Sequence, residues 1–179
     1  MDLHLDRNPH HHIPADFEER SRLWIVSAKN LVTENDPFTY LSIENLMFAE
    51  RLILQMEKSL ARHDGKSPDS HEPLLLKECS AHSILWLCGL YEVTRNLREA
   101  KSPKFRVLEG LHKKLEIARM PLAKHQVVRK HKPHYPTSSW SPETGRVGWQ
   151  VWNPGSNTYE AYVRTDLADE FLEITNANA

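Results

Sequence analysis

Cysteine is scarce in this sequence: its 179 residues include only Cys79 and Cys88. The two lie nine residues apart in a segment with helical spacing, so they fall on opposite sides of that helix and cannot pair within it. We therefore expect no disulfide framework, which favours a reducing compartment. The longest nearly apolar stretch, residues 84–91, is too short to span a bilayer. The first fifteen residues lack the apolar run of a signal peptide, so a cytoplasmic protein without a membrane partner is expected.

Glycine is also scarce, and its six copies are scattered along the chain. This distribution offers no glycine-rich phosphate loop. The sequence likewise lacks a nucleophile elbow, a paired Cys-x-x-Cys motif and an H-E-x-x-H motif. No cofactor is predicted, and the balance of these absences favours a binding protein over an enzyme.

Apolar residues make up 40% of the chain and charged residues 26%, a balance that predicts a packed core rather than global disorder. Residues 1–14 are rich in His, Asp and Pro and are predicted to form a flexible tail. The run His10–His12 in that tail is expected to bind metal ions only weakly and without fixed geometry. We therefore assign no metal site to it.

Four segments have the three- and four-residue apolar spacing of packed helices. They are residues 15–31, 37–62, 73–100 and 103–125. Asp36 followed by Pro37 is a natural start for the second helix. The short break at residues 101–103 favours antiparallel neighbours for the last two. Because proline removes a backbone donor, Pro121 predicts a kink or an end of the fourth helix near Met120.

The last part of the chain has a different character, with aromatic and β-branched segments at 147–152 and 158–163 on either side of a Pro-Gly turn. This pattern predicts a β-hairpin, to which Trp140 can add a third strand, followed by a short helix at 167–174. We expect the hairpin to dock its aromatic side chains on the helices and to leave one aromatic face for a partner.

The sequence thus predicts a mainly α protein. The fold is a four-helix bundle of long antiparallel helices with a C-terminal two- or three-stranded antiparallel β unit and a short final helix. The predicted organisation is a tail at 1–14, the bundle at 15–130, and the β unit with its helix at 131–179, packed on the bundle.

The second and third helices carry apolar residues on more than one side. On the third helix the main stripe contains His82, which we interpret as a core histidine with a polar partner. A bundle of this length does not need so much apolar surface, and an oligomer would bury the surplus. Our first hypothesis is therefore a non-enzymatic helical interaction module that forms a homo-oligomer, expected to be a dimer.

Charge is strongly segregated along the chain. Residues 101–134 carry a net charge of +8, whereas the whole chain carries −1. Lysine and arginine side chains release counterions from nucleic acid, so this segment is a candidate RNA-binding surface. The residues proposed for it are Lys124, Arg129, Lys130 and Lys132. The alternative is that the basic segment neutralises the acidic remainder, within one molecule or across a dimer.

Within the basic segment, Arg119 and His125 are separated by five residues. This spacing is similar to the active-site motif of the HEPN ribonucleases, which are helical bundles and usually dimers. The resemblance implies that these two residues act on RNA. Histidine is suited to general acid or base catalysis and arginine to stabilising phosphate charge. Met120 stands where the family commonly has a polar residue, and Pro121 lies between the pair.

Residues Glu109 and His112 form a Glu-x-x-His motif in the fourth helix. A carboxylate-bridged di-iron bundle needs two such motifs on different helices, and the chain lacks the second. The motif is therefore not predicted to hold a metal.

Overall fold

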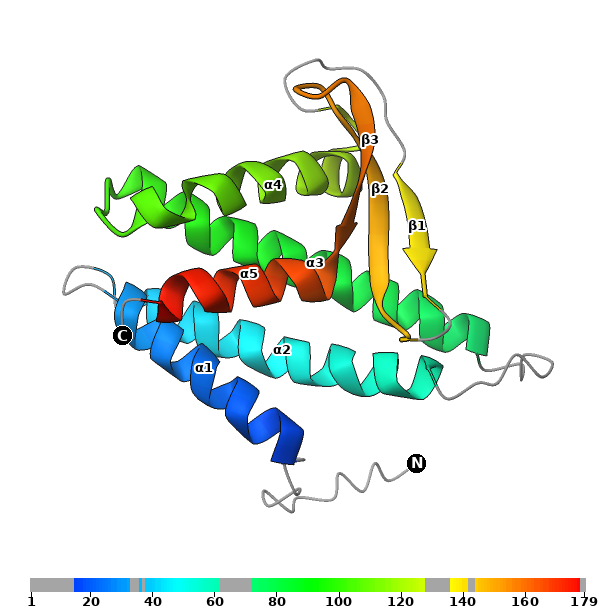
Figure 1. Cartoon of the computed structure of the whole chain (residues 1–179), viewed down its shortest axis with the longest axis horizontal. Helices are drawn as coiled ribbons and strands as arrows, with labels where there is room; N and C mark the ends of the chain where they lie inside the picture. Colours follow the sequence, from blue (N-terminus) through cyan, green and yellow to red (C-terminus); the bar gives the residue numbers. More distant parts are fainter. Residues whose placement is uncertain are drawn as a thin grey trace, which may run out of the picture.

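The computed structural model describes residues 15–32, 36, 38–61, 72–127, 136–141 and 144–177. The predicted tail, with His10–His12, lies outside these residues. The described part contains five helices and three strands (Figure 1). The elements are α1 (Ala15–Leu31), α2 (Phe38–Leu60), α3 (Glu72–Glu99), α4 (Phe105–Lys124), β1 (Thr137–Trp140), β2 (Val147–Asn153), β3 (Thr158–Val163) and α5 (Arg164–Asn176). These confirm the predicted fold class. No described helix is long and apolar enough to cross a membrane.

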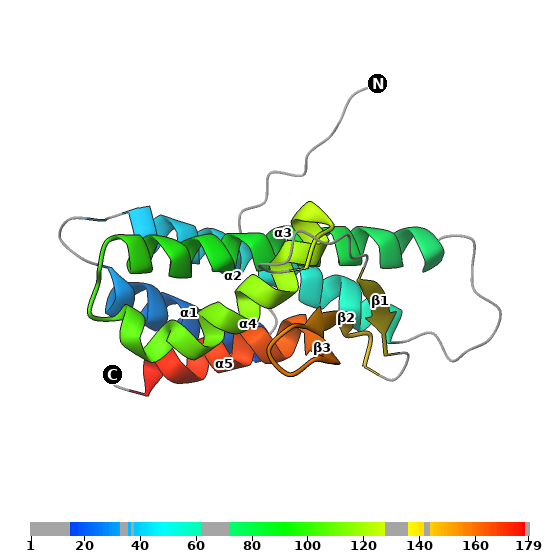
Figure 2. The same ribbon diagram turned by 90° about the horizontal axis from the view of Figure 1, so that it is seen from above.

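The helices form a closed ring, in which each of the first four packs against the next and α5 lies between α4 and α1. Seen from above, α3 runs along one side, whereas α5 and the sheet occupy the other (Figure 2). Trp24 of α1 stands at the centre: its ring stacks on Phe171 of α5 and meets Trp86 of α3 edge-on. All three side chains are fully buried. The final helix is thus a core element of the bundle.

The start of α2 and the two ends of α4 can be compared with the local signals in the sequence. The side chain of Asp36 accepts a hydrogen bond from the Thr39 backbone N–H at 3.2 Å, which confirms it as the cap of α2. The fourth helix begins two residues later than predicted, at Phe105. It does not end near Met120, because Pro121 sits inside the helix and the chain stays helical to Lys124.

The three strands form an antiparallel sheet in the order β1-β2-β3. Val147, Trp149 and Val151 alternate along β2 and are all buried, facing α3 and α4. On the other face, Trp152 meets Tyr159 edge-on, with 5.3 Å between ring centroids, and Tyr159 is exposed. The predicted hairpin therefore docks one aromatic face on the helices and leaves the other outside.

A cluster of buried charges joins α2 to the start of α5. Glu50 and Glu57 lie on the core side of α2, and Arg164 is the first residue of α5, directly after β3; all three are almost completely buried. Arg164 donates to Glu50 Oε1 at 2.8 Å and to Glu57 Oε2 at 2.9 Å. Its guanidinium also lies 5.5 Å from the centre of the Trp86 ring. One arginine therefore bridges two carboxylates that would otherwise be isolated inside the bundle.

The first helix completes this cluster. Arg20 of α1 donates two hydrogen bonds of 2.8 Å to Glu50, and Trp24 Nε1 donates a third at 2.6 Å. Burial raises the pKa of Glu50, but the hydrogen bonds from Arg20 and the charge of Arg164 outweigh burial and hold that pKa below its usual value. Arg20 also forms an ion pair with Asp169 of α5 at 2.6 Å, so two arginines face three carboxylates and the cluster connects α1, α2 and α5.

Candidate functional site

Arg119 projects from α4 onto α3. Its guanidinium lies 4.5 Å from the centre of the Tyr91 ring and 3.6 Å from Glu92 Oε1, and its side chain is 21% exposed. It also contacts the Cys88 thiol; burial raises the pKa of that thiol, and the charge of Arg119 opposes the rise. Burial keeps the thiol protonated, which does not suit a nucleophile. In this setting Arg119 joins two helices.

His125 lies just beyond the last turn of α4. It is exposed, its backbone adopts a left-handed conformation with φ of 53°, and its N–H donates to the Pro121 carbonyl. On a regular helix, side chains six residues apart are about 240° apart around the helix axis. His125 also lies beyond the end of α4. The contacts of Arg119 given above are with Tyr91, Glu92 and Cys88, all on α3. The two candidate residues therefore have different surroundings in the isolated chain.

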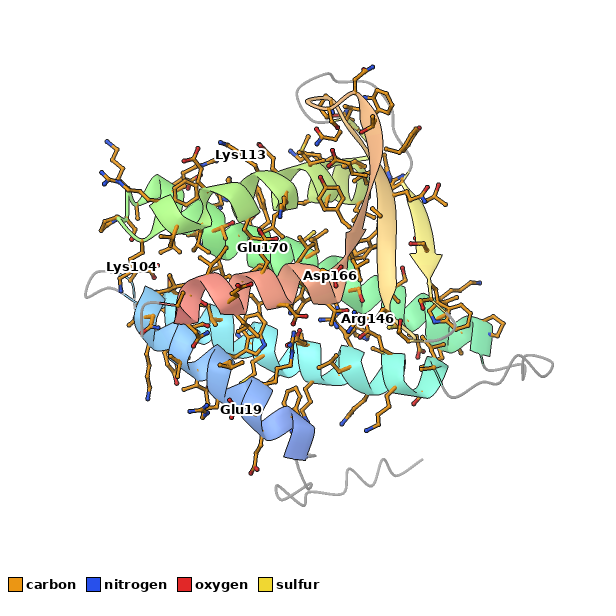
Figure 3. The ribbon with its side chains drawn as sticks, in the orientation of Figure 1. Glu19, Lys104, Lys113, Arg146, Asp166 and Glu170 are labelled. Carbon is orange, nitrogen blue, oxygen red and sulfur yellow. The ribbon has the colours of Figure 1, made fainter. Side chains whose placement is uncertain are left out.

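The rest of the proposed nucleic-acid surface is described only in part. Lys124 is exposed in the last turn of α4, whereas Arg129, Lys130 and Lys132 lie outside the described residues. Upstream, Lys114 forms an ion pair with Glu170, which lies between α5 and α4 (Figure 3). Lys113 pairs with Glu109 at 2.8 Å, and Lys104, just before α4, donates to the carbonyls of Asn30 and Val32 at the end of α1. These contacts agree with mutual neutralisation as a role for the basic charges of α4.

The Glu109–His112 motif is divided between two environments. Glu109 is exposed and pairs with Lys113, whereas His112 is buried between the rings of Tyr91 and Phe105. Their side chains therefore contact different partners. No group of three or more potential metal ligands occurs among the described residues.

The hydrogen bonds of His112 assign its tautomer. Arginine can only donate, so the contact of 2.8 Å from Arg98 Nη1 makes His112 Nε2 an acceptor. The proton then sits on Nδ1 and is donated to Thr94 Oγ1 at 2.8 Å, while the Thr94 hydroxyl donates to the Tyr91 carbonyl. Burial and the adjacent charge of Arg98 lower the pKa of His112. This histidine is therefore held neutral between α3 and α4.

A neutral buried histidine makes stability depend on pH. Below about pH 6.5 the unfolded chain binds a proton that the folded chain resists, so the unfolding free energy should fall as the pH drops from about 7 to about 5. We expect His112→Gln to flatten this dependence, because glutamine keeps one donor and one acceptor but does not titrate. Urea titrations at several pH values measure the effect. The exposed His82 offers the matched control His82→Gln. An unchanged pH dependence in His112→Gln would contradict the assignment.

The outer face of α2 and α3 is the most distinctive apolar surface of the described chain. Six of the eight large apolar side chains that are exposed lie on these two helices: Phe38, Leu41, Phe48, Leu52, Leu74 and Leu85. The four on α2 follow three- and four-residue spacing once Asn45 is included, so they form one stripe. This stripe lies outside the core, because the buried side of α2 carries Ile43, Ile53 and the two glutamates of the charge cluster.

Beside this stripe runs a groove of about 390 Å³ between α2 and α3. Its walls include the small residues Ser42 and Ala49 from α2 and Gly89 from α3, and Leu85 stands at its edge. The two helices approach closely here, since a Cβ on Gly89 would lie 2.9 Å from the Leu46 side chain. Trp86 Nε1 strengthens the same approach by donating to the Leu46 carbonyl at 3.2 Å.

His82 also lines this groove and is exposed, so the prediction of a core histidine is wrong. The neighbours of His82 in the predicted stripe of α3, Cys79 and Trp86, are buried, and at this turn Ser83 takes the buried place instead of His82. Sequence reasoning did not single out Phe48 or Leu85 as surface residues. The signal for Phe48 was present, because the stripe from Phe38 to Leu52 repeats at helical spacing on the side opposite Ile43 and Ile53.

We therefore take the outer face of α2 and α3 as the candidate functional site. It combines exposed apolar side chains with a groove, and Glu92, which lines that groove, connects it to Arg119. No protein-family model, no curated protein and no solved structure shows significant similarity to this chain.

Proposed function

We propose that this protein is a non-enzymatic helical interaction module that forms a homodimer through the outer face of α2 and α3. The observation that carries the proposal is the concentration of exposed apolar side chains on these two helices beside a groove. Soluble monomers rarely expose a contiguous apolar patch of this kind without a partner.

The dimensions of the face fit a dimer interface. A helix of 23 residues such as α2 is about 35 Å long, and two adjacent helices are about 20 Å wide. That face measures about 700 Å², close to the roughly 800 Å² per partner that stable interfaces bury. The face needs no further element of this chain to reach the usual size.

The composition of the face favours a second copy of the same chain. A two-fold interface must complement itself, with projections of one copy entering hollows of the other. Phe48 and Leu85 supply projections, and the small residues beside Gly89 supply the hollow. Glu92 is the charged side chain among the groove residues, and it already forms ion pairs with Arg95 and Arg119. Two copies can meet there without burying an unpaired charge.

The test is light scattering coupled to size exclusion over a wide concentration range. We expect the wild-type protein to have twice the monomer mass. Phe48→Glu and Leu85→Glu should each raise the dimer dissociation constant by at least about tenfold, equal to about 1.4 kcal/mol, because each buries a charge in an apolar contact.

Val107→Glu provides the matched control. Val107 is exposed to a similar degree but lies on α4, away from this face, so its replacement should leave the dimer intact. A wild-type protein that is monomeric at all concentrations would overturn the proposal. A monomer that copurifies with nucleic acid, seen in the ratio of absorbance at 260 and 280 nm, would also overturn it and would favour the basic segment as the working surface.

A further inference from the structure

The strand β1 forms one edge of the sheet. Its residue pairs with β2 include Ser139 with Gly148, and beyond the strand Ser141 donates to the Arg146 carbonyl at 3.1 Å. Hydrogen-bonded pairs alternate along an antiparallel ladder, so Thr137, Ser139 and Ser141 direct their backbone groups towards β2. Ser138 and Trp140 consequently direct their N–H and C=O groups away from the sheet. Among the described residues, no strand pairs with this outer edge.

A groove of about 390 Å³ lies between this strand and α3. Ser138 and Trp140 face it on one side together with Val147 of β2, and Leu76, Lys77 and Ile84 of α3 face it on the other. Ser138 and Trp140 share a sheet face with the buried Trp149 and Val147, because residues directly opposite each other in a ladder point the same way. Ser138 and Trp140 therefore carry both the outward backbone groups of the sheet edge and side chains that line the groove.

Two of the polar side chains that line this groove, those of Lys77 and Trp140, can only donate hydrogen bonds and so favour a negatively charged acceptor. The Nε1 atom of Trp140 is buried and has no hydrogen-bond partner among the described residues. An indole N–H can only donate, and so can the ammonium group of Lys77. No carboxylate is among the side chains that line the groove in the described part of the chain. A buried donor without a partner costs free energy, so a ligand that supplies an acceptor gains affinity.

We propose that an extended peptide with a carboxylate side chain binds along the outer edge of β1 as an added strand. Its backbone pairs with Ser138 and Trp140, and its carboxylate meets Lys77 and the Trp140 indole N–H. Alternate residues of a strand point the same way, so apolar side chains two positions from the carboxylate enter the groove against Leu76 and Ile84. This peptide site is separate from the α2 and α3 face proposed for the dimer.

A fluorescent heptapeptide of sequence Thr-Val-Thr-Glu-Thr-Val-Thr tests the proposal by fluorescence polarisation with the full chain. We expect saturable binding, and we expect the peptide with Lys in place of Glu to bind at least about tenfold more weakly. Methylating the backbone nitrogens of one alternate set of residues should abolish binding, and methylating the other set should not. Equal effects from both sets, or none from either, would overturn strand addition.

Variants of the protein complete the test. Lys77→Glu should weaken binding of the Glu peptide at least about tenfold and improve binding of the Lys peptide, whereas Lys29→Glu on the distant α1 should change neither. Ser138→Pro removes one outward N–H at an edge position that tolerates proline, so it should reduce binding while circular dichroism and the dimer mass stay unchanged. Absence of binding to the wild type would overturn the proposal. Loss of the dimer in Ser138→Pro would assign the edge to a second copy and would also overturn it.

Discussion

Replacing Arg164 by methionine is expected to lower the unfolding free energy by about 3–5 kcal/mol, the largest effect that we predict for a single side chain. The substitution keeps an unbranched apolar stem but removes the charge that bridges Glu50 and Glu57. Both carboxylates are buried, so neither can exchange its lost partner for water. Arg20 still contacts Glu50, but Glu57 loses both of its bonds to Arg164. Urea unfolding followed by circular dichroism measures the loss.

The control for this experiment is Arg146→Met, in the loop between β1 and β2. Arg146 forms an ion pair with Asp166 at 3.7 Å, and both side chains are exposed. The two residues lie near the start of α5 (Figure 3). An exposed pair at this distance contributes little, so the change should stay within about 0.5 kcal/mol. Equal losses in Arg164→Met and Arg146→Met would show that the buried cluster does not hold α5 to α2.

The charge cluster and the proposed dimer face are separate features of α2, because the cluster lies inside each chain rather than on the α2 and α3 face. Its glutamates occupy the core side of α2, whereas Phe48 and Leu52 occupy the outer side. One helix thus carries charge inside and apolar side chains outside. This inversion is consistent with a face that a partner covers and a core that polar contacts align.

The same inversion explains which parts of the fold could be predicted. The predicted ends of α1 to α4 differ from the observed ends by at most two residues, because apolar periodicity and caps act locally. Periodicity does not say which apolar arc faces inward when a helix has two. On α2 the apolar Leu41 and Leu52 are exposed, whereas Glu50 and Glu57 are buried. Their burial depends on Arg164, more than a hundred residues away in the chain.

Long-range contacts also limit what could be predicted of the site. The common site that the spacing of Arg119 and His125 suggests stays a prediction, whereas the contacts of Arg119 with Tyr91 and Glu92 on another helix follow from no local pattern. A helix end intervenes before His125, and its position depends on how the chain leaves Pro121. Likewise, the groove beside β1 is lined by residues from α3 and from two strands, so no local sequence pattern predicts it. The aromatic hairpin was predictable because its turn and its alternation are both local.

Gly145→Ala is expected to lower the unfolding free energy by about 3 kcal/mol or more, the second large effect that we predict. Gly145 adopts φ of 69°, which costs an alanine about 1–2 kcal/mol. A Cβ there would also lie 1.8 Å from the Glu57 carbonyl oxygen of α2, a distance that forces the turn away from the helix. Since Val147 follows in the chain, this movement disturbs the docking of the whole sheet. The melting temperature should fall by about 6–12 °C for a chain of this size.

Gly110→Ala is the matched control, since it makes the same chemical change in a different setting. Gly110 lies on the exposed side of α4, and a Cβ there would meet no atom within 4 Å. Because alanine favours the helix, this variant should be stabilised by about 0.5–1 kcal/mol. The two substitutions should therefore act in opposite directions on the same thermal transition. A Gly145→Ala protein as stable as wild type would mean that Gly145 does not pack against the Glu57 carbonyl of α2.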